Sequence, residues 1–399
     1  MSGEDLAGLY FAYLWKSRHP QDSVTVFEQN ARDATFGFGV VFSDRAMDFL
    51  HAGDPETADQ ITVRMEAWSN ISLVHRGEKV EIDGVGFSAI GRLDLLLLIQ
   101  QRARDAGVEL KFDTHLGSVD DIPQSDVIVA ADGVNSLVRR TFEGDFQTSV
   151  SYLDEKFAWF GTTKTFDTLT QTFVTSKYGT FNAHHYRYSP TMSTFIVECD
   201  RKSWIGAGFD QLDPEASRTR CHEIFAHTLD GHDLIANKST WRNFPWIWND
   251  RWSFKNMVLT GDALRTAHYS IGSGTRLALE DAIALADALD AHRGDIPAAF
   301  AAYEAKRRPI VEKLVRAAKS SAAWYEHFPE HMKLHPLDMA YSYITRSARI
   351  DDQRLREMSP HFMGRYESER ETRLCRNDDI TWPRVASSGQ GDFRSLGVT

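Results

Sequence analysis

Two stretches near residue 270 carry the strongest candidate chemistry in the sequence. Gly261 and Asp262 follow the apolar run "NMVLT", and a glycine-rich segment, Gly272, Ser273, Gly274 and Thr275, precedes a long helical pattern. The free amides and the dipole of a helix start stabilise negative charge, and a carboxylate such as Asp262 binds hydroxyl groups. An ordinary strand–turn–helix connection is the alternative. The order of strand, Gly-Asp, glycine-rich loop and helix favours a cofactor-binding loop.

The N-terminus contains an altered nucleotide-binding fingerprint. Gly3, Asp5 and Gly8 occupy the three glycine positions of G-x-G-x-x-G, but an aspartate at the middle position should repel phosphate. Only Met1 and Ser2 precede Gly3, so the buried strand that usually delivers this loop is missing. The stretch taken alone also fits an acidic helix start.

Three further positions fit a dinucleotide-binding fold. Glu28 ends the β-branched run "SVTVFE", at the place where such folds put an acid that binds the ribose. Arg92 begins a long helix and is able to bind phosphate or ribose. Asp132 and Gly133 end the apolar run "VIVAA" in a tight turn against which a nucleotide can lie. A solvated glutamate, a helix-surface arginine and a plain turn are the alternatives.

Four side chains are candidates for holding a proton during catalysis. His184, His185 and Tyr186 lie in the strand-like run "GTFNAHHYRY", and His268 lies between the two stretches near residue 270. Imidazole and phenol groups serve as general acids or bases when they contact a substrate. A lone strand histidine, however, is more often structural.

Another group of histidines suggests a metal site, which the local pattern disfavours. His327, His331 and His335 recur every four residues, but Pro329 interrupts the helix that would align them. No nearby acid provides an evident second shell of hydrogen bonds. The sequence therefore predicts no metal.

The surrounding patterns predict the elements that position these residues. Strands and helices alternate before residue 155 and after residue 250, which is typical of a parallel α/β sheet. Alternating aromatic and polar residues predict an antiparallel sheet between Lys156 and Cys199. A charged tail from Tyr366 lacks periodicity. The predicted units are a discontinuous first domain (1–155 and 250–323), a β-sheet substrate domain (156–249), and C-terminal helices with a polar tail (324–399).

Composition excludes several classes of partner. The formal net charge of −11 argues against nucleic acid and anionic membranes, because both attract basic surfaces. The longest apolar run is too short to span a bilayer. Three widely spaced cysteines form neither a disulfide framework nor a zinc site, so we expect a reducing cytoplasm. The sequence leaves the oligomeric state open, including a homo-oligomer.

These motifs, in this order, resemble the FAD-dependent aromatic hydroxylases of the para-hydroxybenzoate hydroxylase class. The strings "TFGFGVVFSD", "MSTFIVE", "HYSIGSGTRLALEDA" and "YITRSARID" are most similar to the salicylyl-CoA 5-hydroxylase and 2-aminobenzoyl-CoA monooxygenase branch and to related natural-product hydroxylases. The resemblance implies an FAD-binding Rossmann-like domain of the GR2 type with a second antiparallel sheet that binds the substrate.

The resemblance also implies a reaction. NAD(P)H would reduce bound FAD, O2 would form a flavin C4a-hydroperoxide, and its distal oxygen would attack an activated aromatic or heteroaromatic ring. The substrate would be an aryl-CoA or a natural-product phenol, pyridinol or indole. Phe42, Tyr269 and Ser270 would line the substrate pocket, with Asp262 on the ribityl chain of FAD.

Two departures from the family keep another class open. The altered loop at Asp5 puts FAD affinity in doubt, and the usual "GDAAH" reads "GDALR", with Leu264 and Arg265. Either the start of the chain is misassigned or the enzyme tolerates a weakened pyrophosphate site. A degenerate flavin fold that acts as a non-catalytic binding module is the alternative function.

Overall fold

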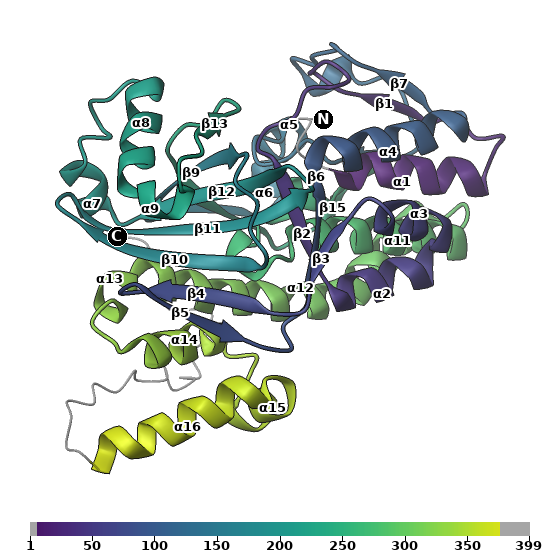
Figure 1. Ribbon diagram of the computed structural model, residues 1–399. Helices are drawn as coiled ribbons and strands as arrows, with labels where there is room; N and C mark the ends of the chain where they lie inside the picture. The colour runs from purple at the N-terminus through teal and green to yellow at the C-terminus, as the bar shows by residue number, and fades with distance from the viewer. Residues whose placement is uncertain (1–5, 376–399) are drawn as a thin grey trace.

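The structure is a computed structural model that describes residues 6–375. Its first region consists of two short sets of strands and the helices around them (Figure 1). In this region β1 (Thr25–Phe27) pairs in parallel with β7 (Glu109–Lys111), β8 (Ile128–Ala130) pairs in parallel with β16 (Met257–Leu259), and β15 (Ser253–Phe254) pairs with β16.

The parallel strands of the first region form two separate pairs in the described residues. Within residues 6–375 no strand lies between β1 and β8, so the sheet is in two parts. In a doubly wound sheet of order 3-2-1-4-5, that central place belongs to the first strand.

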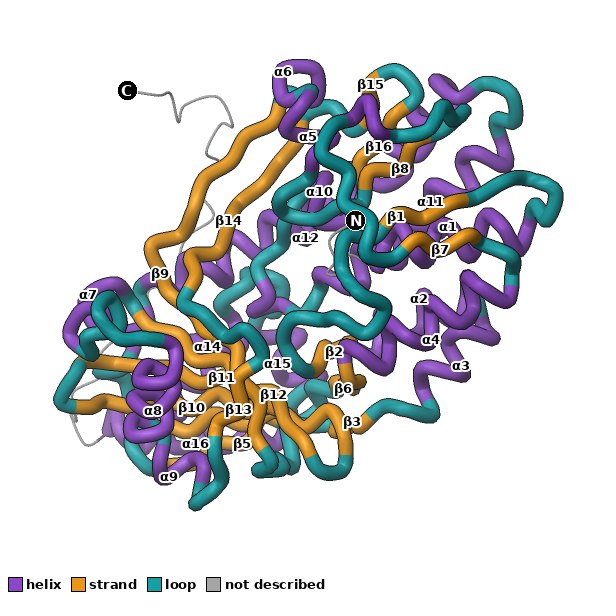
Figure 2. The backbone as a smooth tube through the Cα atoms, turned by 90° about the horizontal axis from the view of Figure 1, so that it is seen from above, coloured by secondary structure: helices purple, strands orange, loops and turns teal. Residues whose placement is uncertain are grey.

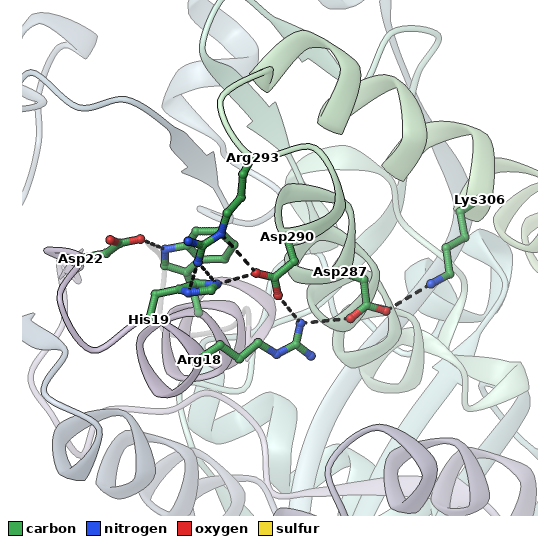
Figure 3. Close-up of polar contacts among 8 residues, drawn as sticks. Arg18, His19, Asp22, Asp287, Asp290, Arg293 and Lys306 are labelled. Atoms are coloured by element: carbon green, nitrogen blue, oxygen red, sulfur yellow. Dashed lines mark hydrogen bonds and ion pairs between the residues drawn. The ribbon is translucent and has the colours of Figure 1, made fainter.

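Four helices cover this first region. They are α1 (Leu6–Arg18), α4 (Arg92–Asp105), α11 (Gly274–Ala291) and α12 (Ile296–Glu326). Helix α1 is buried from Leu6 to Leu14 and packs between α4 and α11. At its exposed end Arg18 lies 3.0 Å from Asp287 and 3.1 Å from Asp290 (Figure 3). Exposed ion pairs contribute little, so apolar burial holds α1 in place.

A large sheet forms the second region. Its strand order is β13-β9-β12-β11-β10-β4-β5, and β14 also pairs with β9. The strands are β4 (Ile71–His75), β5 (Glu78–Ile82), β9 (Thr148–Thr162), β10 (Leu169–Ser176), β11 (Gly179–Ser189), β12 (Met192–Cys199), β13 (Leu234–Ala236) and β14 (Arg242–Asn249). All neighbours are antiparallel except β10 and β4. The sheet thus takes two strands from the part of the chain before residue 155. The long pair β9 and β14 runs between the two regions (Figure 2).

Helices cover both faces of the large sheet. Helices α7 (Arg201–Gly206), α8 (Pro214–Ile224) and α9 (Ala226–Leu229) lie on one face, while α12, α13 (Phe328–His331) and α14 (Pro336–Thr345) lie on the other (Figure 1). Helices α15 (Asp352–Met358) and α16 (Pro360–Cys375) follow. The α/β architecture, with a mainly antiparallel second sheet and C-terminal helices, confirms the predicted fold class.

Smaller elements connect the two regions. A three-stranded sheet contains β2 (Gly39–Ser43), β6 (Phe87–Gly91) and β3 (Glu66–Trp68). The short helices are α2 (Asp44–Gly53), α3 (Pro55–Thr62), α5 (Leu137–Thr141), α6 (Glu143–Phe146) and α10 (Gly261–Leu264), with 3-10 turns η1 (Val119–Asp121) and η2 (Tyr269–Ile271).

The region after Tyr366 differs from its prediction up to the end of the described residues. Helix α16 continues to Cys375, because Arg365 pairs with Glu369 one turn later and Arg373 donates to Asp338 at 2.7 Å. Within residues 6–375 no helix is both long and apolar enough to cross a membrane.

Candidate active site

The loop between β16 and α11 has the backbone that a closely approaching ligand requires. Gly261 and Gly272 both adopt left-handed conformations, with φ of 58° and 60°. A Cβ atom at Gly272 would lie 3.3 Å from Cγ2 of Val41. The side chain of Ser273 does not cap α11, so no capping side chain covers the first-turn amides of that helix. This arrangement suits an electron-rich group that lies over the loop.

The other residues predicted to bind a cofactor follow the carboxyl ends of parallel strands. Glu28 comes directly after β1, Asp132 follows β8, and Asp262 follows β16. Ligands of open α/β sheets bind outside these strand ends. Burial raises the pKa of Glu28, which accepts hydrogen bonds from the amide and side chain of Asn30 at 2.8 Å.

Two further predicted positions have local structural roles. Asp132 accepts a hydrogen bond from the backbone amide of Leu137 at 2.5 Å. The amide of Arg92 donates to the carbonyl of Phe38 at 2.7 Å, which fixes the start of α4 beside β2. Gly8 is buried inside α1. Gly3 and Asp5 lie outside the described residues.

One face of the large sheet carries a row of buried polar side chains, which we call the inner face. Asn182 pairs with Glu198 on β12, and His184 pairs with Gln171 on β10. Because directly opposed residues point to the same side and side chains alternate along a strand, these four and Tyr186 share one face. The inner face is therefore Gln171, Asn182, His184, Tyr186 and Glu198.

Hydrogen bonds fix part of this face and leave the rest unpaired. In the amide orientation that satisfies its neighbours, Asn182 donates to Oε2 of Glu198 at 2.5 Å and to Oε1 of Gln171 at 2.9 Å. Glu198 Oε1, Gln171 Nε2 and both ring nitrogens of His184 are buried without a hydrogen-bond partner in the described residues. Buried polar atoms are rarely left unpaired, so a ligand is expected to complete them.

A second layer of polar groups faces this sheet from the loop before α11. His268 Nδ1 lies 2.8 Å from Oγ of Ser270, which lies 2.7 Å from Oγ of Ser321. Arg346 donates to the carbonyl oxygen of Ser270 at 2.7 Å and to Oγ of Ser321 at 3.0 Å. The structure thus brings His268 and Ser270 to the half-buried Arg346, whose charge also acts on His184.

The electrostatics of the site follow from burial. Desolvation, with the charge of Arg346, lowers the pKa of both His184 and His268 to about 3. Burial raises the pKa of Glu198 to about 8, although Tyr269 and Arg346 oppose this shift. Both histidines are therefore neutral near pH 7, and Glu198 titrates close to it.

Two of the predicted residues do not reach this site. His185 points to the opposite face of the sheet, where it lies 2.9 Å from Oγ1 of Thr172 and stacks on Phe195. Phe42 is buried in the core of the first region, and its neighbour Val41 is the residue that faces Gly272. Strand alternation explains both errors, because adjacent residues on a strand face opposite sides.

Tyr186 lies on the inner face, but its hydroxyl makes a structural hydrogen bond. It donates to the carbonyl oxygen of Gly39 at 2.7 Å and so joins β11 to β2. Sequence reasoning missed Gln171, Asn182, Glu198 and Arg346. A polar residue inside the apolar run "STFIVEC" is the signal that marks Glu198, because such residues are rarely buried without a role.

Comparison with known proteins decides the family. Residues 92–318 match the family model described as "FAD binding domain". The chain belongs to this FAD-binding family. It is 39% identical to a salicyloyl-CoA 5-hydroxylase of Streptomyces sp, over 86% of this chain and 69% of that protein. It is 36% identical to the 3-hydroxy-4-methyl-anthranilyl-[aryl-carrier protein] 5-monooxygenase of Streptosporangium sibiricum, over 83% of this chain and 89% of that protein.

The fold agrees with this assignment. The solved structure of PqsL, a probable FAD-dependent monooxygenase from Pseudomonas aeruginosa, matches with a TM-score of 0.65 at 21% identity, over 82% of this chain and 96% of that chain. The chain is thus an FAD-dependent monooxygenase, and the prediction of FAD as its cofactor is confirmed. The comparisons give no support to a non-catalytic binding module.

The residues of this chain fit the cofactor. The space at Gly274, where an added Cβ atom would meet nothing within 4 Å, leaves the start of α11 open, and the uncapped first turn of this helix offers amides to the electron-rich edge of a flat ring system.

Proposed function

We propose that the enzyme hydroxylates an aromatic ring that is carried as an acyl thioester, on coenzyme A or on a carrier protein. One relative is named for a CoA-bound aryl group and another for an aryl group on a carrier protein. The main support for this proposal is the inner face, which is a buried polar surface with unpaired atoms. It faces the loop before α11. Such a surface suits a small aromatic substrate held close to the cofactor.

A surface hollow supports the thioester form of the substrate. It has a volume of about 550 Å³ and is lined by Ala67, Trp68, Ser69, Gly84, Gly86 and Phe87. The ring of Trp68, which lines the hollow, lies 6.1 Å from the ring of Tyr186 on the inner face. An aryl group at the inner face would then leave its carrier arm in the open hollow.

The protein's contribution is positioning and water exclusion. Bound FAD, reduced by NAD(P)H, supplies the oxygen-transfer chemistry with O2. The proposed cofactor contacts are Glu28, Arg92, Asp132, Gly261, Asp262 and Gly272–Thr275. His184 and His268 are proposed to hydrogen-bond the substrate as neutral imidazoles, since both are buried beside Arg346. Tyr269 and Ser270 are proposed to line the pocket.

We also propose that the enzyme works in the cytoplasm. Cys199, Cys221 and Cys375 are all free thiols, which favours the reducing cytoplasm.

The experiment compares carriers on the FAD-loaded enzyme. Salicyloyl-CoA, 2-aminobenzoyl-CoA and free salicylate are incubated with NADH or NADPH under isotopically labelled O2, and products are analysed by mass spectrometry. We expect one labelled oxygen atom on the ring of a thioester and much slower turnover of the free acid. Trp68→Ala should raise KM for the thioester and leave the free acid unaffected. Absence of labelled product from both thioesters would contradict the proposal.

A further inference from the structure

We propose that Glu198 accepts a hydrogen bond from the activating substituent of the ring, and then the proton where that substituent is a hydroxyl, so that the enzyme selects arenes whose substituent is a hydroxyl or an amine. This inference rests on the proposed function and adds to it a base and a selection rule. Neither the family match nor the relatives' names assign a role to this residue.

The geometry of Glu198 is that of a preset acceptor. Its side chain is fully buried on β12, and Asn182 holds Oε2 at 2.5 Å. Asn182 is itself fixed by Gln171, so the carboxyl group cannot turn freely. The other oxygen, Oε1, has no hydrogen-bond partner in the described residues. One oxygen is therefore anchored and the other is left for a donor.

The groups around Glu198 support a ligand rather than a satisfied core. Tyr269 faces it from η2, and the interaction of its hydroxyl with the Glu198 carboxyl group lowers the pKa of that carboxyl group. Neither the Tyr269 hydroxyl nor Glu198 Oε1, however, makes a hydrogen bond of full geometry in the part of the chain that the structure describes. His184, on the same face, is buried with both ring nitrogens unpaired. Unpaired buried donors and acceptors from two separate elements converge here, which is the pattern of a site for a polar ligand.

A second buried carboxyl group, that of Glu155, lies close to Glu198 on the same sheet. Glu155 lies on β9, two residues from Phe157, which pairs directly with Glu198. It is buried, and both of its oxygens are unpaired in the described residues. Burial and the charge of Glu198 raise the pKa of Glu155 well above its usual range. Glu155 therefore keeps its proton while Glu198, near Arg346, is the group able to ionise.

The histidines are poorer candidates for this role. His184 and His268 both have pKa values lowered to about 3, so each binds a proton weakly. Burial raises the pKa of Glu198 to about 8, which is near the pH at which a general base works best. The titratable and charged groups that interact with Glu198 are Glu155, Tyr269, Tyr325, Arg346 and the adjacent Cys199.

The proton step is simple to balance. With a hydroxyl substituent, the O–H bond breaks, the proton bonds to Glu198 Oε1, and the electron pair stays on the oxygen. An amine substituent only donates a hydrogen bond to Oε1, because the lone pair of its nitrogen already activates the ring. The pair left on the oxygen increases the electron density of the ring at its ortho and para carbons, which favours attack by an electrophilic oxygen. A methoxy group cannot undergo this step, because it has no proton to give.

The test compares salicyloyl-CoA with 2-methoxybenzoyl-CoA on the FAD-loaded enzyme. Binding is followed by the change in flavin absorbance, and turnover by product formation. We expect the wild type to bind the hydroxyl compound roughly 10- to 100-fold more tightly, as for a hydrogen bond to a charged group. Glu198→Gln should reduce this ratio to less than about threefold and remove the acid limb of the kcat–pH profile. Glu198→Asp should keep that limb.

Controls separate this inference from the proposed function. Glu81→Gln changes an exposed glutamate on β5 of the same sheet and should keep the wild-type ratio. Equal binding and hydroxylation of both compounds by the wild type would overturn the role of Glu198 and leave the proposed function standing. So would a Glu198→Gln enzyme with an unchanged ratio and pH profile. If the wild type bound and hydroxylated neither compound, both proposals would fall.

Discussion

Arg346 fixes the backbone of Ser270, because its guanidinium donates to the Ser270 carbonyl oxygen at 2.7 Å while its ring contact with Tyr343 holds it at 3.7 Å from the ring centre. Ser270 belongs to the turn η2 that leads into the glycine-rich loop. A residue after α14 thus sets the shape of a loop that begins α11, more than seventy positions earlier in the chain.

Arg346→Gln should therefore loosen this loop. We expect the free energy of unfolding to fall by about 2 kcal/mol, since a charge-assisted hydrogen bond to a buried carbonyl is lost. The pKa values of His184 and His268 should rise, because the positive charge of Arg346 helps to lower both. Denaturant unfolding and histidine NMR titration measure these effects. Arg354→Gln, at an exposed position of α15, is the control. Unchanged histidine titration would contradict the contact.

Two glycines of the loop should respond differently to alanine. Gly272→Ala places a Cβ atom in a left-handed residue and 3.3 Å from Val41, so it should destabilise the apoprotein by about 1–2 kcal/mol and weaken FAD binding. Gly274→Ala meets nothing within 4 Å and should leave apoprotein stability within about 0.5 kcal/mol of the wild type. It should still weaken FAD binding if the cofactor approaches the start of α11.

Thermal unfolding of the apoprotein and titration with FAD, followed by fluorescence quenching, distinguish the two effects. Wild-type FAD affinity in Gly274→Ala would place the flavin away from this helix start.

Local patterns predicted the elements whose residues interact with near neighbours. Helix α4 and the strands β1, β7, β8 and β16 follow from short periodic runs. The pairing of β4 with β10 was not predictable, because it joins residues almost a hundred positions apart. The helical continuation beyond Tyr366 was missed because the contact of Arg373 with Asp338 is also distant in sequence.

The candidate site shows the same limit more sharply. The sequence indicated both His184 and His185, but only the pairing partners of β11 determine which of the two faces the site. Glu198 gave little signal by itself. Its importance comes from Tyr269 and Arg346, which distant segments bring to it. Residues that act through convergence of separate elements are not visible in a linear pattern.

A buried ion-pair network links the start of α11 to α12. The carboxylate of Asp281 pairs with Nη2 of Arg265 at 2.5 Å and with Nε of Arg307 at 2.7 Å, and all three side chains are buried. Asp281→Asn should lower the free energy of unfolding by about 3–5 kcal/mol, because Arg265 loses its charged partner in a buried site. Arg307 then keeps only Glu280, at 2.7 Å. Asp287→Asn, in the exposed cluster of Figure 3, should cost less than about 1 kcal/mol. Equal losses in the two variants would contradict this distinction.

His184 and Glu198 should give stability opposite dependences on pH, which oppose each other between about pH 4.5 and 6.5. His184 is neutral when folded, with a pKa lowered to about 3, so the unfolded chain takes up a proton first as pH falls below about 6.5 and stability is lost. Glu198 has a pKa raised to about 8, so the unfolded chain releases its proton first and stability is lost as pH rises from about 4.5 to 8.

Replacing either group should remove its own contribution to the pH dependence of the free energy of unfolding. Each group contributes at most about 1.4 kcal/mol per pH unit. Glu198→Gln should remove the loss of stability between about pH 6.5 and 8 and make the loss below about pH 6.5 steeper, while His184→Gln should reduce that acid loss, as measured by urea unfolding between about pH 5 and 8. Parallel profiles for wild type and both variants would show that neither group stays buried.

His184 and Tyr186 should control coupling rather than flavin reduction. His184 lies on the inner face with both nitrogens unpaired, and Tyr186 joins that face to Gly39 of β2. His184→Ala removes a side chain that we expect to touch the ring, so the product formed per NAD(P)H consumed should fall severalfold and released peroxide should rise. Tyr186→Phe should have a smaller effect, because it loosens β2 by about 1 kcal/mol without opening the site.

The measurement is the ratio of product, peroxide and NAD(P)H consumed, together with the rate of flavin reduction in stopped flow. That rate should stay within about twofold of the wild type in both variants, since neither residue lies in the loop proposed to hold the flavin. Tyr178→Phe, whose hydroxyl faces Glu223 at the outer end of the sheet, is the control and should keep full coupling. Wild-type coupling in both test variants would remove the inner face from the substrate site and leave His268 and Ser270 as the contacts to examine.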